Sequence, residues 1–224
     1  MASTKQNIIW HLNNIPKNTR LALEYLSNQS WLKGTDWYLA GGTALTLQVG
    51  HRLSLDLDFF LPKKDFRTTV LLKHFPGTIW HTDVNEEGTV YGRLYNAKIS
   101  FIAYPFFIPE QPVLYFGNVA IVDKRDIAVM KIIAISQRGK KRDFFDLYWY
   151  LHHCESLFDI ILRVARQYPT VAHDYHHIMK SLMYFADAEI DPMPEIFFDT
   201  TWAQVKKYFQ KEIPVVTKRI LKLN

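Results

Sequence analysis

The segment that decides the fold runs from Gly41 to Phe60 and has the sequence GGTALTLQVGHRLSLDLDFF. It follows a short apolar stretch, residues 37–40, which predicts a buried strand that the two glycines interrupt. Residues 43–49 then predict a helix, and Gly50 is placed to end it. A glycine turn of this kind is by itself usually a plain connection from strand to helix, and it indicates a phosphate site only together with the carboxylates that follow it.

The second feature of this segment is a pair of carboxylates, Asp56 and Asp58, on a predicted strand over residues 55–61. Because successive side chains of a strand alternate, both carboxylates face one side, and the apolar Leu55, Leu57 and Phe59 face the other. Two like charges among apolar residues are unfavourable unless a cation compensates them. Mg²⁺ fits, since one or two carboxylates commonly bind it together with water and substrate phosphates.

The glycine turn predicts the phosphate end of the same site. Gly41 and Gly42 precede a helix N-terminus, whose free N–H groups attract phosphate, and the hydroxyl of Thr43 can add a donor. Ser54 either contacts phosphate or is a hydroxyl at the strand entry. The adjacent residues 51–52, His-Arg, either contact the nucleotide or lie at an exposed helix end.

A second group of charged residues lies in the later, helical part of the chain. Lys131 and Arg138 are two helical turns apart and share one face of a helix that Asp123 can cap. Asp143 and Asp146 share one face of the next helix, residues 142–152. The cations could bind the β- and γ-phosphates of a nucleotide. The two carboxylates could orient those cations, accept a proton, or simply form structural ion pairs.

The remaining pattern predicts an α+β chain with a mixed sheet domain at residues 1–122 and a helical domain at residues 123–224. Further strands are expected at residues 78–84, 89–95, 97–104 and 119–122. Further helices are expected at residues 16–32, 66–75, 156–167, 172–186, 201–211 and 215–221.

Composition limits the classes of protein that fit. The chain has 224 residues, 48% of them hydrophobic, and a net charge of +5, which weakly favours anionic partners such as nucleic acid or nucleotides. One cysteine, Cys154, cannot form an internal disulfide. Apolar runs are too short to span a bilayer, and the N-terminus lacks the pattern of a secretory signal. We therefore expect a cytoplasmic protein without a membrane partner.

The motifs together resemble a known family. Residues 38–60 are similar to the AbiEii/AbiGii-type toxins, which belong to the polymerase-beta-like nucleotidyltransferase superfamily and form the enzyme half of type IV toxin–antitoxin pairs. The later motif, Lys131, Ala134 and Arg138 followed by RDFFDLY at residues 142–148, also resembles this family. The resemblance covers about residues 37–150.

The resemblance implies a Mg²⁺-dependent nucleotidyltransferase that moves a nucleoside monophosphate from an NTP to an acceptor hydroxyl. RNA, with tRNA preferred, is the implied acceptor, and an antitoxin is the implied protein partner. It assigns catalysis to Asp56, Asp58, Lys131 and Asp143, and Mg²⁺ binding to the first two. It assigns nucleotide binding to Gly41, Gly42, Thr43, Lys131 and Arg138, and we add Ser54 from its place two residues before Asp56 on the predicted strand.

One position departs from the pattern of the wider superfamily. A third carboxylate is usual on a neighbouring strand, and the matching position here is Ser100. Serine is a poor Mg²⁺ ligand and no general base at neutral pH. Either Asp143 or Asp123 substitutes for the missing group, or catalysis is weak, or the chain binds nucleotide without turnover. Modification of a small molecule, as by antibiotic nucleotidyltransferases, is the other alternative.

Overall fold

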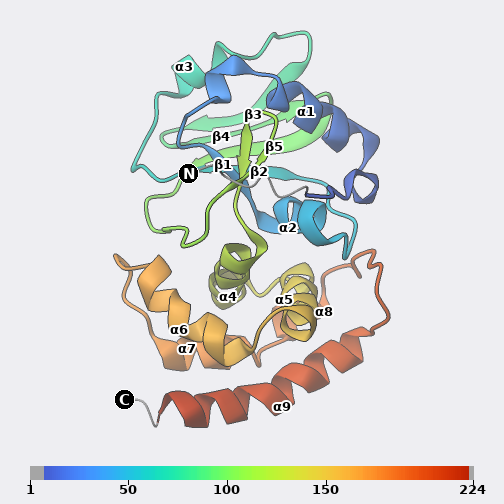
Figure 1. Ribbon diagram of the computed structural model, residues 1–224, viewed down its shortest axis with the longest axis vertical. Helices are drawn as coiled ribbons and strands as arrows, with labels where there is room; N and C mark the ends of the chain where they lie inside the picture. The colour runs from blue at the N-terminus through green and yellow to red at the C-terminus, as the bar shows by residue number, and fades with distance from the viewer. Residues whose placement is uncertain (1–7, 222–224) are drawn as a thin grey trace.

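A mixed β-sheet forms the upper half of the molecule in the computed structural model, which describes residues 8–221 (Figure 1). Its order is β3-β4-β5-β2-β1-β7-β6. The strands are β1 (Tyr38–Ala40), β2 (Leu57–Leu61), β3 (Trp80–Glu86), β4 (Thr89–Leu94), β5 (Ala97–Ala103), β6 (Leu114–Phe116) and β7 (Val119–Ile121). The α+β class predicted from the sequence is confirmed.

The central strands carry the predicted glycine and aspartate motifs. β2 pairs antiparallel with β1 and parallel with β5, which places both motifs at the middle of the sheet. Leu57 and Phe59 are buried on one face of β2, as their alternation predicted. The expectation for Leu55 was wrong: it precedes the strand, which begins at Leu57, and its side chain is 53% exposed.

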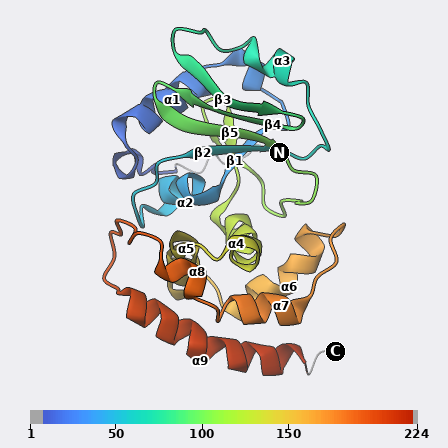
Figure 2. The same cartoon turned by 180° about the vertical axis from the view of Figure 1, so that it is seen from behind.

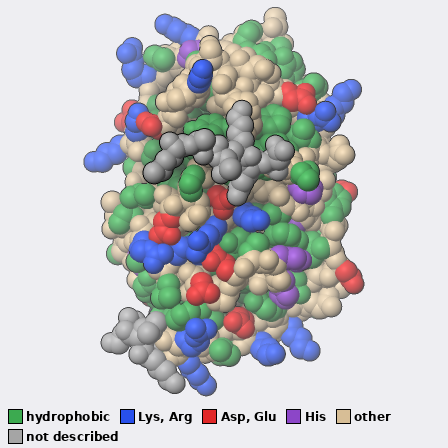
Figure 3. Space-filling view, in the orientation of Figure 1, with side chains coloured by type: hydrophobic (Ala, Val, Ile, Leu, Met, Phe, Trp, Pro, Cys, Tyr) green, Lys and Arg blue, Asp and Glu red, His purple; other side chains and the backbone are tan. Residues whose placement is uncertain are grey.

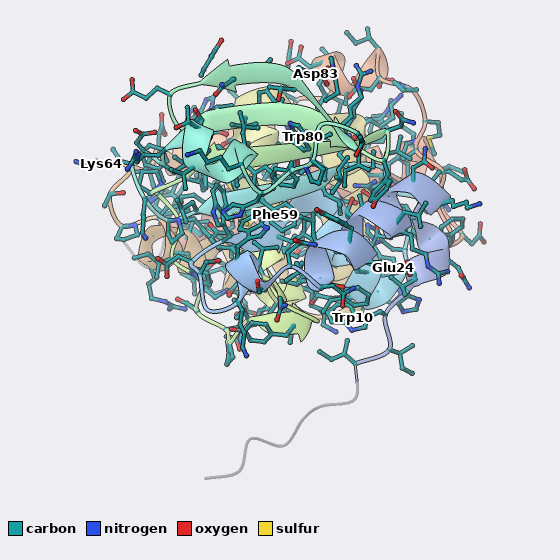
Figure 4. The ribbon with its side chains drawn as sticks, turned by 90° about the horizontal axis from the view of Figure 1, so that it is seen from above. Trp10, Glu24, Phe59, Lys64, Trp80 and Asp83 are labelled. Atoms are coloured by element: carbon teal, nitrogen blue, oxygen red, sulfur yellow. The ribbon has the colours of Figure 1, made fainter. Side chains whose placement is uncertain are left out.

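Aromatic side chains fill the space between the sheet and the helices above it. Phe101 of β5 contacts the rings of Phe59, Trp31, Phe75 and Trp80, with centroids 5.1 to 6.4 Å apart. Figure 4 shows Phe59 near the middle of the molecule, seen from above. The covering elements are the 3₁₀ helix η2 (Ser30–Leu32) and the helices α1 (Lys17–Ser27) and α3 (Thr68–Leu72), while the 3₁₀ helix η1 (Leu12–Asn14) lies beside α2 (Gly41–Val49).

Helices cover the lower face of the sheet and build the lower half of the molecule, as both views show (Figures 1 and 2). Next to the sheet lie α2 (Gly41–Val49), α4 (Lys124–Arg138) and α5 (Lys141–His153). The others are α6 (Leu157–Gln167), α7 (Tyr175–Ser181), α8 (Ala186–Glu189) and α9 (Trp202–Ile220). In the described residues no helix is both long and apolar enough to cross a membrane.

Several predicted boundaries were wrong. The helix expected at residues 16–32 ends at Ser27, and that expected at residues 172–186 is divided into α7 and α8. The two helices expected at residues 201–211 and 215–221 form one continuous helix, α9, which contains Pro214. A proline removes one hydrogen bond and its ring crowds the preceding turn, but buried residues of α9 on both sides of it, such as Ile213 and Val216, keep the helix in one piece.

A returning segment links the later part of the chain to the first. The N–H of Leu53 donates to the carbonyl of Glu195 at 2.8 Å, and the N–H of Phe197 donates to the carbonyl of His51 at 2.8 Å. The sheet ends and the helices begin near residue 122, but backbone pairs of this kind cross that line. The division into two domains therefore stays a prediction.

Candidate active site

A cavity of about 350 Å³ lies between the sheet and α4. Its polar part is lined by Gly41, Gly42, Arg52, Ser54, Asp56, Asp58, Ser100, Lys131, Arg138 and Arg142. Its apolar part includes Phe60, Ile102, Tyr104, Met130 and Tyr168. Figure 3 shows lysine and arginine side chains gathered across the middle of one face of the molecule, with acidic side chains among them. The cavity therefore combines cations, carboxylates and an aromatic surface.

Asp58 lies at the centre of the polar part. It is directly opposite Ala40 on β1 and Ser100 on β5, and the Ser100 hydroxyl donates a 2.6 Å hydrogen bond to its Oδ1. Burial raises the pKa of Asp58 despite this hydrogen bond, and the charge of Asp56 raises it further. Ser100 therefore occupies the place, beside the aspartate pair, that the departure from the superfamily pattern predicted.

Asp56 lies just before β2 and is more open to solvent, with 31% of its side chain exposed. Its Oδ2 is 3.5 Å from Nη1 of Arg142, whose side chain reaches across the cavity from the first turn of α5. The two carboxylates thus line one wall, and a cation from the helical part approaches them from the other.

The two glycines are required by close contacts. Gly41 has a φ of +75°, and a Cβ there would lie 3.0 Å from Oδ2 of Asp58. A Cβ on Gly42 would lie 2.2 Å from Nη2 of Arg52, so only glycine leaves room for that guanidinium. Both glycines belong to the first turn of α2, where unpaired N–H groups are available to a ligand.

Thr43 and Ser54 hold this turn against the aspartate segment. The Thr43 side chain is buried and contacts the backbone carbonyl of Asp56 as well as the Ser54 hydroxyl, the latter at 2.8 Å. Ser54 lines the cavity, but Thr43 does not. The structure thus gives Thr43 a supporting position behind the site and leaves Ser54 open to a ligand.

A series of alternating charges runs along the cavity wall, with its three cations lining the cavity and its two carboxylates behind them. Asp146 of α5 accepts two hydrogen bonds from Arg52, of 2.5 and 2.9 Å, and its Oδ2 is 2.5 Å from Nζ of Lys131. Asp143 is 2.6 Å from the same Nζ and 3.0 Å from Nε of Arg138. We call these five residues the charge ladder. It joins α4 and α5 to the segment that follows α2.

The ladder keeps its buried carboxylates ionised. Burial alone would raise the pKa of Asp146, but Arg52 and Lys131, with hydrogen bonds from His51 and Arg52, hold it well below its ordinary value. Lys131 and Arg138 likewise outweigh burial and lower the pKa of Asp143. The alternating order of the charges thus compensates the loss of hydration.

His51 and Arg52 do not form an exposed helix end, so that expectation was wrong. Their exposed fractions are 2% and 4%. Both side chains turn inward because Asp146 attracts them: His51 Nε2 is 2.7 Å from Oδ1 of this carboxylate. No local sequence pattern predicts this contact, since Asp146 lies more than ninety positions further along the chain.

The position of Asp143 favours one of the roles considered for it. Both of its oxygens contact cations, its side chain is fully buried, and it does not line the cavity. Orienting Lys131 and Arg138 fits this environment better than accepting a proton from a substrate. Asp123, the other candidate substitute, caps α4 by accepting a hydrogen bond from the N–H of Arg125 and also lies outside the cavity lining.

The carboxylate pair fits a hard cation. No cluster of three or more histidine, cysteine, aspartate or glutamate side chains that could hold a metal is present in residues 8–221. Asp56, Asp58 and the Ser100 hydroxyl instead offer oxygen atoms only. Mg²⁺ accepts such an incomplete set because water and substrate phosphates complete its octahedral shell.

Comparisons with known proteins place the chain in a family. The family model described as "Nucleotidyl transferase AbiEii toxin, Type IV TA system" matches residues 29–88 and 91–215. An uncharacterised protein of Aquifex aeolicus (strain VF5) is 33% identical over 209 residues, which cover 90% of this chain and 97% of the relative.

Two solved structures share the fold. A crystal structure described as a candidate nucleotidyltransferase from H. pylori has a TM-score of 0.53 and 18% identity. The match covers 100% of this chain and 99% of the H. pylori chain. MenT4, a nucleotidyltransferase toxin from Mycobacterium tuberculosis H37Rv, has a TM-score of 0.55 and 15% identity, covering 89% of this chain and 84% of its own. At these identities the likeness concerns the fold alone.

Proposed function

The chain belongs to the AbiEii family of type IV nucleotidyltransferase toxins, and we propose that it transfers a nucleoside monophosphate from an NTP to a hydroxyl of RNA. We propose tRNA as the acceptor, the cytoplasm as the place of action and a cognate antitoxin as the protein that opposes it. Asp56 and Asp58 are the proposed Mg²⁺ ligands.

The observation that carries this proposal is the row of groups across three neighbouring strands. Ala40, the last residue of β1, is paired with Asp58 on β2, and Asp58 is paired with Ser100 on β5; Gly41 directly follows Ala40. A triphosphate bound at the N-terminus of α2 would place its α-phosphate near Asp58. Lys131 and Arg138 line the opposite wall, where they can neutralise the β- and γ-phosphates.

In the proposed reaction the oxygen of the acceptor hydroxyl attacks the α-phosphorus. The new oxygen–phosphorus bond forms as the bond to the β-phosphate bridging oxygen breaks, and pyrophosphate leaves. The hydroxyl proton passes to solvent or to the pyrophosphate. Bound Mg²⁺ would supply positive charge to the α-phosphate and the leaving group. Asp143 keeps Lys131 and Arg138 in place for the triphosphate.

Ser100 supports a second candidate function, NTP binding without turnover. The serine hydroxyl donates to Asp58 and brings no third carboxylate to the site. A protein of this kind would still bind Mg²⁺ and NTP at the same residues.

A single-turnover experiment separates the two. The chain is incubated with Mg²⁺, cellular RNA and each α-labelled NTP in turn, with a panel of aminoglycosides as a parallel acceptor. We expect label on RNA with at least one NTP. The Asp58→Asn variant, which keeps the shape of the side chain but loses its charge, should transfer at least a hundredfold less. Tight Mg-NTP binding without transfer to any acceptor would exclude the transferase function and support NTP binding without turnover.

The Lys131→Ala variant tests the assignment of the cations. We expect it to weaken NTP binding more than RNA binding, because the lysine is placed opposite the triphosphate. Removing Lys131 also leaves Asp143 and Asp146 with fewer partners, so the melting temperature of the variant must be measured beside its affinity. The reverse order of losses in a folded variant would place Lys131 on the acceptor side.

A further inference from the structure

A ligand in the cavity can extend in two directions relative to the sheet, across the strands or along them. Across the strands lie Ala40, which Gly41 follows, then Asp58, Ser100 and Tyr91, each paired in register with the next. With the triphosphate at Gly41, the acceptor must approach from the Ser100 side, in line with the departing pyrophosphate. The nucleoside on the α-phosphate cannot occupy this line and must extend along the strands instead.

An aromatic surface lies in that second direction. Phe60 is two residues beyond Asp58 on β2, roughly 7 Å along the strand, and is paired in register with Ile102 on β5. Tyr104 follows β5, with its ring centroid 5.4 Å from that of Phe60. Tyr168, which follows α6, has its ring centroid 6.3 Å from that of Tyr104 and lines the cavity, as does Met130 of α4. Both the sheet and the helices therefore supply apolar walls.

Hydroxyl groups are present within this apolar surface. The hydroxyls of Tyr104 and Tyr168 are 3.5 Å apart, a long and weak hydrogen bond. Tyr38 is next to Phe60 in the sheet and its ring stacks at 6.0 Å on that of Phe60, but it lies behind this surface and does not line the cavity. Among the described residues, this weak contact is the hydrogen bond of the Tyr104 and Tyr168 hydroxyls, so these two cavity-lining groups retain hydrogen-bonding capacity. A flat ligand with polar edges fits such a surface.

We propose that Phe60, Tyr104 and Tyr168 form the subsite for the nucleobase of the NTP. The inference rests on the proposed function, which places the triphosphate at the glycine turn. The base lies against the Tyr104 and Phe60 rings, and the tyrosine hydroxyls are within the wall that meets its edges. Tyr91, 42% exposed beyond Ser100, lies on the acceptor side and is outside this subsite.

Inorganic tripolyphosphate provides the test because it has the phosphates of an NTP and no base. Calorimetry with Mg²⁺ measures the affinities of tripolyphosphate and of the four NTPs for wild type, Tyr104→Ala, Tyr104→Phe and Tyr91→Ala. Tyr104→Ala should weaken the best NTP about tenfold, because aromatic stacking contributes that much to base binding. It should leave tripolyphosphate binding within twofold. Tyr104→Phe should keep most of the NTP affinity, and Tyr91→Ala should keep it entirely.

Retained tripolyphosphate binding shows that the Tyr104→Ala variant is folded. The inference is overturned if this variant keeps full NTP affinity, if it loses tripolyphosphate and NTP affinity equally, or if Tyr91→Ala is the variant that loses NTP affinity. Failure of the proposed function is a different result: wild type would then bind neither tripolyphosphate nor any NTP in the presence of Mg²⁺.

Discussion

Asp58 combines a stabilising hydrogen bond with an unfavourable charge. Its pKa is raised by burial and by the neighbouring Asp56, which means that the ionised form is disfavoured in the metal-free chain. Ser100 offsets part of this cost by donating a hydrogen bond, and it does so without adding charge. Ser100 therefore lowers the cost of burying Asp58 beside Asp56 in the fold.

The Ser100→Asp variant tests this balance. A third carboxylate beside Asp58 removes the donor and adds repulsion, so the melting temperature without Mg²⁺ should fall. A loss of 1 kcal/mol corresponds to about 2–4 °C for a chain of this size. Mg²⁺ affinity should rise at least tenfold, and single-turnover transfer should rise with it.

The matched control is Ser100→Ala, which removes the hydrogen bond alone and should not tighten Mg²⁺ binding. Unchanged Mg²⁺ affinity in Ser100→Asp would show that Ser100 is not at the third-ligand position. Tighter Mg²⁺ binding with slower transfer would show that another group already serves the acceptor hydroxyl.

At the level of elements, the charge ladder connects α4 and α5 to the segment that follows α2. The helical spacing of Lys131 and Arg138, and of Asp143 and Asp146, was evident in the sequence, because periodicity determines which residues share a helix face. The ion pairs between different elements were not evident in the sequence, since the packing of the helices decides which side chains meet. Arg52 and Asp146 are 94 positions apart, and no local pattern relates them.

The difference between local patterns and tertiary packing also explains which other sequence-based predictions were right and which were wrong. The strand pattern at residues 57–61 and the capped start of α4 follow from local rules, and both were predicted. The short β6 was missed because three residues carry no measurable alternation, and its pairing with β7 depends on the turn between them. Tyr168 joins the cavity from beyond α6, through tertiary packing alone.

The Asp146→Asn variant tests the ladder. It leaves Arg52 and Lys131 buried with one carboxylate fewer, which should lower the free energy of unfolding at pH 7 by about 3–5 kcal/mol. Because the folded-state pKa of Asp146 is lowered, its contribution is complete above its unfolded pKa, about 4, and is lost as the pH falls further. Urea unfolding from pH 7 to pH 3 should therefore show the two proteins converging below about pH 4.

An exposed ion pair provides the control. Glu110 contacts Arg166 at 2.7 Å on the surface, so Glu110→Gln should cost at most about 1 kcal/mol. A difference between wild type and Asp146→Asn that stays constant down to pH 3 would mean that the Asp146 charge does not stabilise the fold.

At the scale of the whole molecule, the sheet and the helices share one site and one set of supporting contacts. The carboxylates and the glycine turn come from the sheet half, while Lys131, Arg138 and Arg142 come from the helical half. The segment 195–197 returns to pair with residues 51–53, directly beside the ladder. A cavity built this way needs both halves to be folded.

We therefore expect the full chain to unfold in one cooperative transition, and residues 1–122 not to fold alone. Without α4 and α5, Arg52 and His51 lose Asp146, and the apolar side of α2 loses the helices that cover it. Calorimetry of the full chain should give equal calorimetric and van't Hoff enthalpies. The 1–122 fragment should show no cooperative transition, and mixing it with the 123–224 fragment should restore one.

Saturating Mg-NTP at 100 times its dissociation constant should stabilise the full chain by about 2.7 kcal/mol. A 1–122 fragment that melts cooperatively near the midpoint of the full chain would contradict the expected single transition, and the two parts would then be independent domains that meet only at the substrate.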